Sequence, residues 1–365
     1  MRVRYSAQED GTLVKKAVVY TCDEHGIDAA LVDSDAVLIV KRLRQAGYEG
    51  YIVGGAVRDL ILNRKPKDFD IVSNATPSQI RKLFRNSRII GQRFQLVHVA
   101  LGNKIFEVCT FRSLREGSTG NVFGTIEEDV LRRDFTINAL FYEPTEELVV
   151  DYIDGLKDMQ EKRIKPIIPL AIIFQEDPVR MIRAVKYSVL TNFKLPATLK
   201  QKIQQQAALL ANVSSSRLTE ELFKIIHSSQ AQEIVDKLNS LDLYQYLQYS
   251  AAQLMQEDAF RTRYLSSLSQ IVPEEPGSDL AALVRDYLND TTDWQNDEHE
   301  IYKSAFHAAR HFILPMSPPR VNLDKAVRLI FKEHGIAIKQ AYYPERIRQS
   351  VEKLAHRRQH RHHRQ

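Results

Sequence analysis

Cysteine is scarce in this chain of 365 residues, which contains only Cys22 and Cys109. The two lie far apart and form no Cys-x-x-Cys pair, which argues against a disulfide-rich secreted domain and a zinc ribbon. Long apolar runs are also missing, because prolines interrupt the longest candidate, at 166–174. We therefore expect no membrane partner. The N-terminal segment lacks a signal-peptide pattern, so the cytoplasm is the expected location.

Charge of one sign is not in large excess, with 51 Lys and Arg against 46 Asp and Glu, a net charge of +5. The last ten residues, HRRQHRHHRQ, contain four arginines and no acid, so they carry +4 of that charge. Such a cationic end often meets a polyanion, but a solvated tail or a remnant of a purification tag has the same composition. The whole chain is 44% apolar and 27% charged, which is typical of a globular protein. Its length predicts two or three domains.

Helical and strand patterns alternate over residues 36–155 and then give way to helices. A helix is expected from Asp35 to Gly47, and its apolar face is expected to hold Val37, Leu38, Val40 and Leu43. Another helix is expected at 56–62, and Thr76 is placed to cap a third. Strands are expected at 50–54, 69–72, 88–91, 96–101 and 104–110. Beyond residue 169 helical spacing dominates to about residue 354.

These patterns predict an α+β fold, with a small mixed-sheet head domain followed by all-helical neck and body modules. The expected domains are an N-terminal extension (1–35), the head (36–160), a helical neck (161–270), a helical C-terminal domain (271–354) and a basic tail (355–365).

The sharpest motif combines a Gly54-Gly55 turn with two acids, Asp68 and Asp70. Alternate residues of a strand share a face, so the two carboxylates are expected side by side. Such a pair repels unless a cation lies between them, and oxygen ligands suit Mg²⁺ whose shell is completed by phosphate and water. The glycines allow backbone N–H groups to approach a triphosphate, and Arg58 adds positive charge. The alternative is a solvated turn with two unrelated acids.

A third acid would complete a two-metal centre, and the sequence offers two candidates. Glu107 faces away from its apolar neighbours on the strand 104–110. Asp134 follows Arg132 and Arg133, which can hold phosphate or order the site, and it can accept a hydrogen bond from a ribose hydroxyl. The sequence does not decide between the two acids or between the two arginines. An exposed, charged helix start is the alternative for this segment.

Asp177, Arg180 and Arg183 are spaced to lie roughly on one helical face. An exposed acid and arginine at this spacing usually form a weak surface pair. The functional alternative is base recognition, because a carboxylate and a guanidinium match the amino group and ring nitrogen of adenine.

Together these motifs resemble the bacterial class II nucleotidyltransferases, a group that contains tRNA CCA-adding enzymes and bacterial poly(A) polymerase I. The resemblance rests on three motifs and runs from about Ile27 to Glu221: Gly54-Gly55 with Arg58-Asp59 and Asp68-Phe69-Asp70, then Arg132-Arg133-Asp134-Phe135-Thr136-Ile137-Asn138-Ala139, and Glu176-Asp177-Pro178-Val179-Arg180-Met181-Ile182-Arg183. Two further segments, 89–99 and 217–221, resemble those of poly(A) polymerases rather than CCA-adding enzymes.

The resemblance implies a template-independent poly(A) polymerase that adds AMP from ATP to RNA 3′ ends. Its partners are then messenger RNA or other transcripts, and the sequence names no protein partner. Asp68 and Asp70 are the implied ligands of Mg²⁺, with Mn²⁺ as an alternative ion. The implied catalytic residues are Asp68, Asp70, Asp134 and Glu107, and the implied nucleotide contacts are Gly54, Gly55, Arg58, Arg132, Arg133, Asp177, Arg180 and Arg183. A CCA-adding enzyme acting on tRNA and a non-catalytic RNA-binding descendant remain as alternatives.

Overall fold

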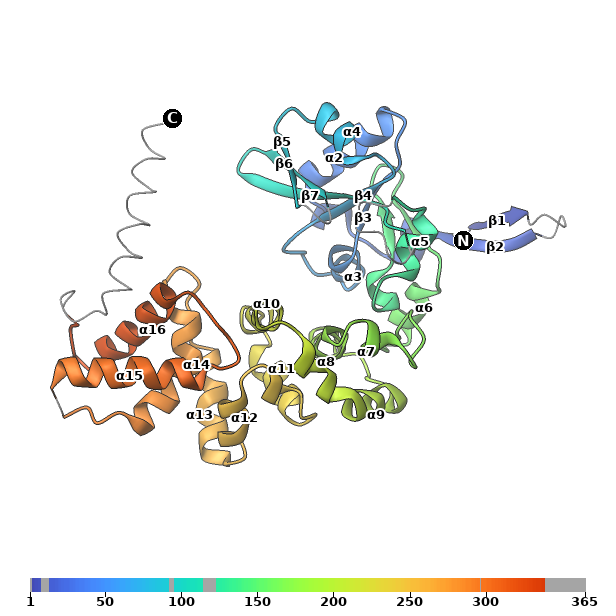
Figure 1. Cartoon of the computed structure of the whole chain (residues 1–365). Coiled ribbons are helices and arrows are strands. Elements are labelled where there is room, and N and C mark those ends of the chain that lie inside the picture. Colours follow the sequence, from blue (N-terminus) through green and yellow to red (C-terminus); the bar gives the residue numbers. More distant parts are fainter. Residues whose placement is uncertain (1, 8–12, 92–94, 114–122, 296, 339–365) are drawn as a thin grey trace. The chain divides into compact units, whose positions relative to one another are not determined.

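The chain is described here by a computed structural model that covers residues 2–7, 13–91, 95–113, 123–295 and 297–338 (Figure 1). It divides into two compact units, residues 1–173 with 191–199, and residues 174–190 with 200–365. The first holds the sheet and the second is built from helices, which confirms the predicted α+β class. The finer division of the helical part into neck and C-terminal domain stays a prediction. The predicted basic tail, 355–365, and residues 92–94 of the segment 89–99 lie outside the described residues.

Nine strands of the described residues form one sheet. They are β1 (Arg2–Ala7), β2 (Leu13–Tyr20), β3 (Gly50–Val53), β4 (Asp70–Ser73), β5 (Ser87–Ile90), β6 (Leu96–Leu101), β7 (Lys104–Thr110), β8 (Phe141–Glu143) and β9 (Leu148–Asp151). Their order is β1-β2-β9-β8-β3-β4-β7-β6-β5, and the β4–β7 pair is parallel whereas the other pairs are antiparallel. The five predicted strands are confirmed within about a residue, and β1 and β2 extend the sheet from a segment in which the sequence predicted no element.

The helices of the first unit are α1 (Cys22–His25), α2 (Ser34–Gln45), α3 (Gly55–Ile61), α4 (Pro77–Leu83), α5 (Ile126–Leu131) and α6 (Gly155–Gln160). Figure 1 shows α2 and α4 together on one face of the sheet and α3 on the other. Thr76 caps α4 as predicted, with Gln79 completing a capping box. The predicted apolar face of α2 is wrong in part, because Ile39 is buried while Leu38 is 44% exposed.

The core that supports the site lies where α5 packs on the sheet. Val53 of β3, Val72 of β4 and Phe141 of β8 are buried in one cluster with Ile126 and Val130 of α5. Burying side chains of this size stabilises the unit by roughly 1.5–3 kcal/mol each. This packing holds the C-terminal end of α5 next to the ends of β3 and β4.

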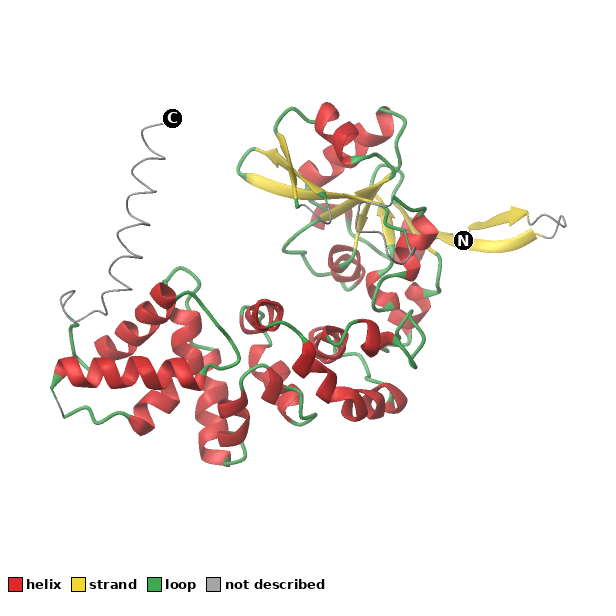
Figure 2. Ribbon diagram, in the orientation of Figure 1, coloured by secondary structure: helices red, strands yellow, loops and turns green. Residues whose placement is uncertain are grey.

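Helices joined by loops make up the described part of the second unit, as Figure 2 shows. Its helices are α7 (Ile173–Glu176), α8 (Val179–Thr191), α9 (Ala197–Gln206), α10 (Ser215–Ile226), α11 (Ala231–Asn239), α12 (Tyr249–Leu254), α13 (Asp258–Leu268), α14 (Ser278–Thr291), α15 (Glu298–Phe312) and α16 (Arg320–Glu333). None of the helices in the described residues combines the length and apolar character needed to cross a membrane.

Candidate active site

The two predicted metal ligands lie at the start of β4. Asp70 is the first residue of the strand and pairs with Val53, the last residue of β3. Asp68 precedes the strand by two residues, and both acids are exposed while Phe69 and Ile71 are buried. The predicted alternation of acidic and apolar residues is therefore confirmed, although the strand begins at Asp70 rather than before it.

Glu107 lies beside this pair on the same sheet. In the parallel β4–β7 pair Ile71 lies opposite Val108, so one residue earlier on each strand places Asp70 next to Glu107. Partial burial, followed by the charges of Glu107 and Asp68, raises the pKa of Asp70, and Arg133 opposes this shift. The three acids therefore bring negative charge together beside the start of β4, which a bound cation would relieve.

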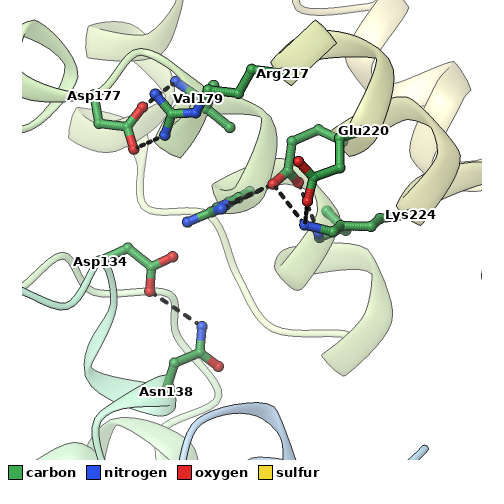
Figure 3. A network of polar contacts seen from close by, with 10 residues as sticks. Asp134, Asn138, Asp177, Val179, Arg217, Glu220 and Lys224 are labelled. Carbon is green, nitrogen blue, oxygen red and sulfur yellow. Dashed lines mark hydrogen bonds and ion pairs between the residues drawn. The ribbon is translucent and has the colours of Figure 1, made fainter. Parts of the chain in front are cut away.

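Asp134, the other candidate for the third acid, lies after α5. Its carboxylate accepts hydrogen bonds from the backbone N–H of Phe135 at 2.8 Å and from the Asn138 side chain at 3.3 Å (Figure 3). Within the described residues, no three His, Cys, Asp or Glu side chains gather closely enough to hold a metal by themselves. A divalent ion at Asp68 and Asp70 therefore needs further oxygens from a substrate and water.

The glycine turn between β3 and α3 lies directly against the acids. Gly54 has φ 72° and ψ −136°, a left-handed backbone conformation that side chains disfavour. A Cβ atom built there would lie 3.8 Å from Asp70 Oδ2 and 3.9 Å from Arg133 Nη1. At Gly55 the nearest such contact is Arg58 Nη2, at 3.4 Å. The turn thus places bare backbone beside both the acids and the arginines.

Arg58 is buried and faces protein groups. Its Nη1 donates to Asn138 Oδ1 at 2.9 Å, and its Nε and Nη2 donate to Asp59 Oδ1 at 2.9 and 2.8 Å. Arg58 therefore connects α3 to the segment that carries Asn138. Its predicted contact with a nucleotide stays a prediction.

Asp129, which the sequence reasoning missed, holds both arginines of the Arg132-Arg133 pair. Its Oδ1 accepts from Arg132 Nε and Nη2 at 2.8 and 2.5 Å and from the backbone N–H of Arg112 at 3.2 Å. Its Oδ2 accepts from Arg133 Nε and Nη2 at 3.1 and 2.8 Å. The signal in the sequence was the spacing, because residues three and four positions after an acid share its side of a helix.

The residues predicted to recognise the base, Asp177 and Arg180, each form an ion pair with another side chain of the second unit. Asp177 precedes α8, so its predicted place on a helical face is wrong. Its carboxylate accepts from the Val179 N–H at 3.1 Å and from Arg217 Nη2 at 2.6 Å (Figure 3). Arg180, in the first turn of α8, donates to Glu176 Oε2 at 2.9 Å. Arg217 of α10 is thus a further candidate, because it orients the Asp177 carboxylate.

Glu221 of α10 is 2% exposed and holds Arg183. It accepts from Arg183 Nη2 at 2.9 Å and from Lys186 Nζ at 3.1 Å. Burial alone would raise the pKa of Glu221, but the Lys186 and Arg183 charges outweigh it and lower the pKa to about 2. Arg183 therefore connects α8 to α10.

Because the pKa of Glu221 is lower in the folded chain, we expect the free energy of unfolding to decrease at acidic pH. The ordinary pKa of Glu221 is 4.5 and the folded value is about 2, so its contribution is complete above pH 4.5 and is lost as the pH falls toward 2. The difference corresponds to about 3 kcal/mol. Urea unfolding from pH 6 to pH 3 should show a smaller loss of stability for Glu221→Gln than for the wild-type chain. Identical losses would contradict the assignment.

Two known protein families match separate parts of the chain. Residues 50–165 match the family described as "Poly A polymerase head domain", and residues 192–254 match "Probable RNA and SrmB-binding site of polymerase A". The first match contains the acids, the glycine turn and the arginine pair. These matches, together with a CCA-adding enzyme that is 32% identical and covered over 67% of its length, show that the chain belongs to the class II nucleotidyltransferases.

Within this class the similarity is to two kinds of enzyme. Poly(A) polymerase I of Salmonella typhi is 42% identical over 241 residues, which cover 62% of this chain and 52% of that protein. The CCA-adding enzyme of Lactobacillus helveticus is 32% identical over 276 residues, covering 70% and 67%. The crystal structure of the Bacillus stearothermophilus CCA-adding enzyme with CTP is 26% identical, with a TM-score of 0.56 and 82% coverage of each chain. The chain spans about half the length of the poly(A) polymerases it matches.

Proposed function

We propose that this chain is a template-independent poly(A) polymerase, which transfers AMP from ATP to RNA 3′ ends and releases pyrophosphate. The observation that carries the choice of poly(A) addition is the 42% identity to poly(A) polymerase I of Salmonella typhi, against 32% to the CCA-adding enzyme of Lactobacillus helveticus. Nucleotidyl transfer itself is supported by the start of β4, where Asp70 lies beside Glu107, Gly54 and Arg133. Phosphoryl transfer depends on positioning and charge neutralisation rather than on a covalent nucleophile. The start of β4 and the Gly54 turn offer carboxylate oxygens, accessible backbone N–H groups and the Arg133 guanidinium for that purpose.

Mg²⁺, or Mn²⁺ in its place, fits the start of β4 because Asp68 and Asp70 offer exposed oxygens, and because desolvation and then the charges of Glu107 and Asp68 raise the Asp70 pKa. When bound, the ion supplies positive charge to the phosphate oxygens. Glu107 adds the third carboxylate. Arg132 and Arg133 offset the charge of the departing pyrophosphate, and Asp134 accepts a hydrogen bond from the ribose.

Asp177 and Arg180 are proposed to select the base. A carboxylate accepts from the adenine amino group, and a guanidinium donates to the neighbouring ring nitrogen. Mispaired edges leave buried polar groups unsatisfied, so such a site rejects other bases strongly. The RNA-binding match over 192–254 supports RNA as the second substrate, in messenger or other transcripts. The basic tail would add salt-sensitive contacts to the RNA backbone.

CCA addition to tRNA is the second candidate function. The coverage of the relatives favours it. The match covers 67% of the CCA-adding enzyme of Lactobacillus helveticus but only 52% of the poly(A) polymerase I of Salmonella typhi. The acids, glycines and arginines described above serve either reaction.

The two functions are distinguished by nucleotide use. The purified chain is incubated with a tRNA lacking its 3′ CCA and, separately, with an unstructured RNA, each with ATP or CTP. Long tails from ATP alone on both RNAs are expected. Incorporation of CTP that stops after a short fixed addition on the tRNA would establish CCA addition instead.

The roles of the two candidate acids predict different kinetic effects. Glu107→Gln should lower kcat by about a hundredfold, because it removes the carboxylate that lies next to Asp70 in the active site. Asp134→Asn should chiefly reduce the preference for ATP over dATP, since its partner is the ribose hydroxyl. Steady-state kinetics with both nucleotides measure this. A larger fall in kcat for Asp134→Asn than for Glu107→Gln would reverse the assignment.

A further inference from the structure

Asp129 is a charged side chain in the interior of the first unit. It is 0% exposed, although an isolated buried carboxylate is costly. Five N–H donors from Arg112, Arg132 and Arg133 surround its two oxygens. The pKa of Asp129 is lowered because the two arginines outweigh its burial. The carboxylate is thus kept ionised in the interior by the donors that it holds.

The contacts of Asp129 fix the direction of each guanidinium. Each arginine uses its Nε and one Nη on a single carboxylate oxygen, which defines the orientation of the guanidinium plane. The remaining Nη1 of Arg133 donates to the Asn138 carbonyl at 3.1 Å and lies near the Gly54 backbone. Two arginines around one acid leave one positive charge that Asp129 does not neutralise.

We propose that Asp129 is a positioning residue that aims Arg132 and Arg133 at the phosphates of the nucleotide. The proposal rests on the proposed function for the location of the nucleotide, but it concerns phosphate binding and not the choice of base or RNA. Within the pair, Arg133 is the arginine that lies beside Gly54 and Asp70, so the substitution that tests the pair is made at Arg133.

Asp158 provides a matched control for a purely structural role. It is also buried, at 1% exposure, and it pairs with Arg163 at 2.6 Å and Lys165 at 3.7 Å. Removing its charge disturbs the first unit in a similar way without touching the arginine pair. A change seen for Asp129 and not for Asp158 therefore reports on positioning.

The test measures binding of inorganic tripolyphosphate to the full chain in EDTA by calorimetry. Asp129→Asn is expected to weaken binding about tenfold, the equivalent of one charge-assisted contact. Asp158→Asn should stay within about twofold of wild type. Arg133→Lys keeps the charge but loses the two-pronged contact, so it should weaken binding by a similar factor to Asp129→Asn. If Asp129→Asn does not fold, the affinity of Arg133→Lys for tripolyphosphate tests the proposal instead.

Wild-type affinity in both Asp129→Asn and Arg133→Lys would overturn the proposal, and so would an equal loss in Asp158→Asn. Failure of the wild-type chain to bind tripolyphosphate would also overturn it. Because the assay contains no RNA, metal or base, a chain that binds tripolyphosphate but makes no poly(A) refutes the proposed function alone.

Discussion

Replacing Asp68 and Asp70 together by asparagine is expected to lower the rate of nucleotide addition on the order of 10⁴-fold. Asparagine keeps the shape of the side chain but removes the charges that hold a divalent ion. The fold should persist, since both side chains reach the surface and the raised pKa of Asp70, caused by desolvation from the surrounding protein atoms and then by its acidic neighbours, means that its charge opposes folding. Primer extension measures the rate, and thermal unfolding should show a Tm equal to or above that of the wild type.

The chain contains its own control for this experiment. Asp33 and Asp35 are also two residues apart, but Lys104 already holds them, with Nζ at 2.7 and 3.1 Å from their carboxylates. Asparagine caps a helix as well as aspartate does, so replacing this pair should leave the rate within about twofold. An unchanged rate in the Asp68 and Asp70 variant would show that the catalytic acids lie elsewhere.

The second large effect is expected on stability. Glu221→Ala leaves Lys186 and Arg183 without their shared carboxylate, and removing one partner of a buried ion pair typically costs about 3–5 kcal/mol. Such a loss is a large part of the stability of a domain. Urea unfolding at neutral pH should show a lower midpoint for this variant than for the wild type. Its nucleotide-transfer activity should also be lower at warm temperatures.

Glu220 is the neighbouring control, because its side chain is 66% exposed and its partner Lys224 lies on the surface at 2.7 Å (Figure 3). Glu220→Ala should change the free energy of unfolding by less than about 1 kcal/mol. Similar losses for the two alanine variants would mean that burial of Glu221 is not what makes its contacts important.

Local sequence patterns predicted the elements that carry the site. The alternation of Asp68 to Ile71, the glycine turn and the Thr76 cap are each determined within a few residues, so they can be read without the fold. The apolar face of α2 was harder, because residues 37–40 are all apolar and periodicity does not identify the buried ones.

These local patterns could not predict contacts between residues that are far apart in the sequence. Glu107 lies beside Asp70 only because β4 and β7 pair in parallel in one register. Arg217 meets Asp177 across 40 residues of sequence. Asp129 appeared to be one acid of a charged helix start, and its burial depends on how α5 packs against the sheet.

The central claim is that Asp68 and Asp70 together hold a divalent ion where a nucleoside triphosphate binds. A crystal structure of the full chain with Mg²⁺ and a nonhydrolysable ATP analogue tests it most directly. We predict metal density in contact with an oxygen of each acid and with the phosphates, beside the Gly54 turn. An analogue bound elsewhere, or acid oxygens turned apart with no metal between them, would contradict the account.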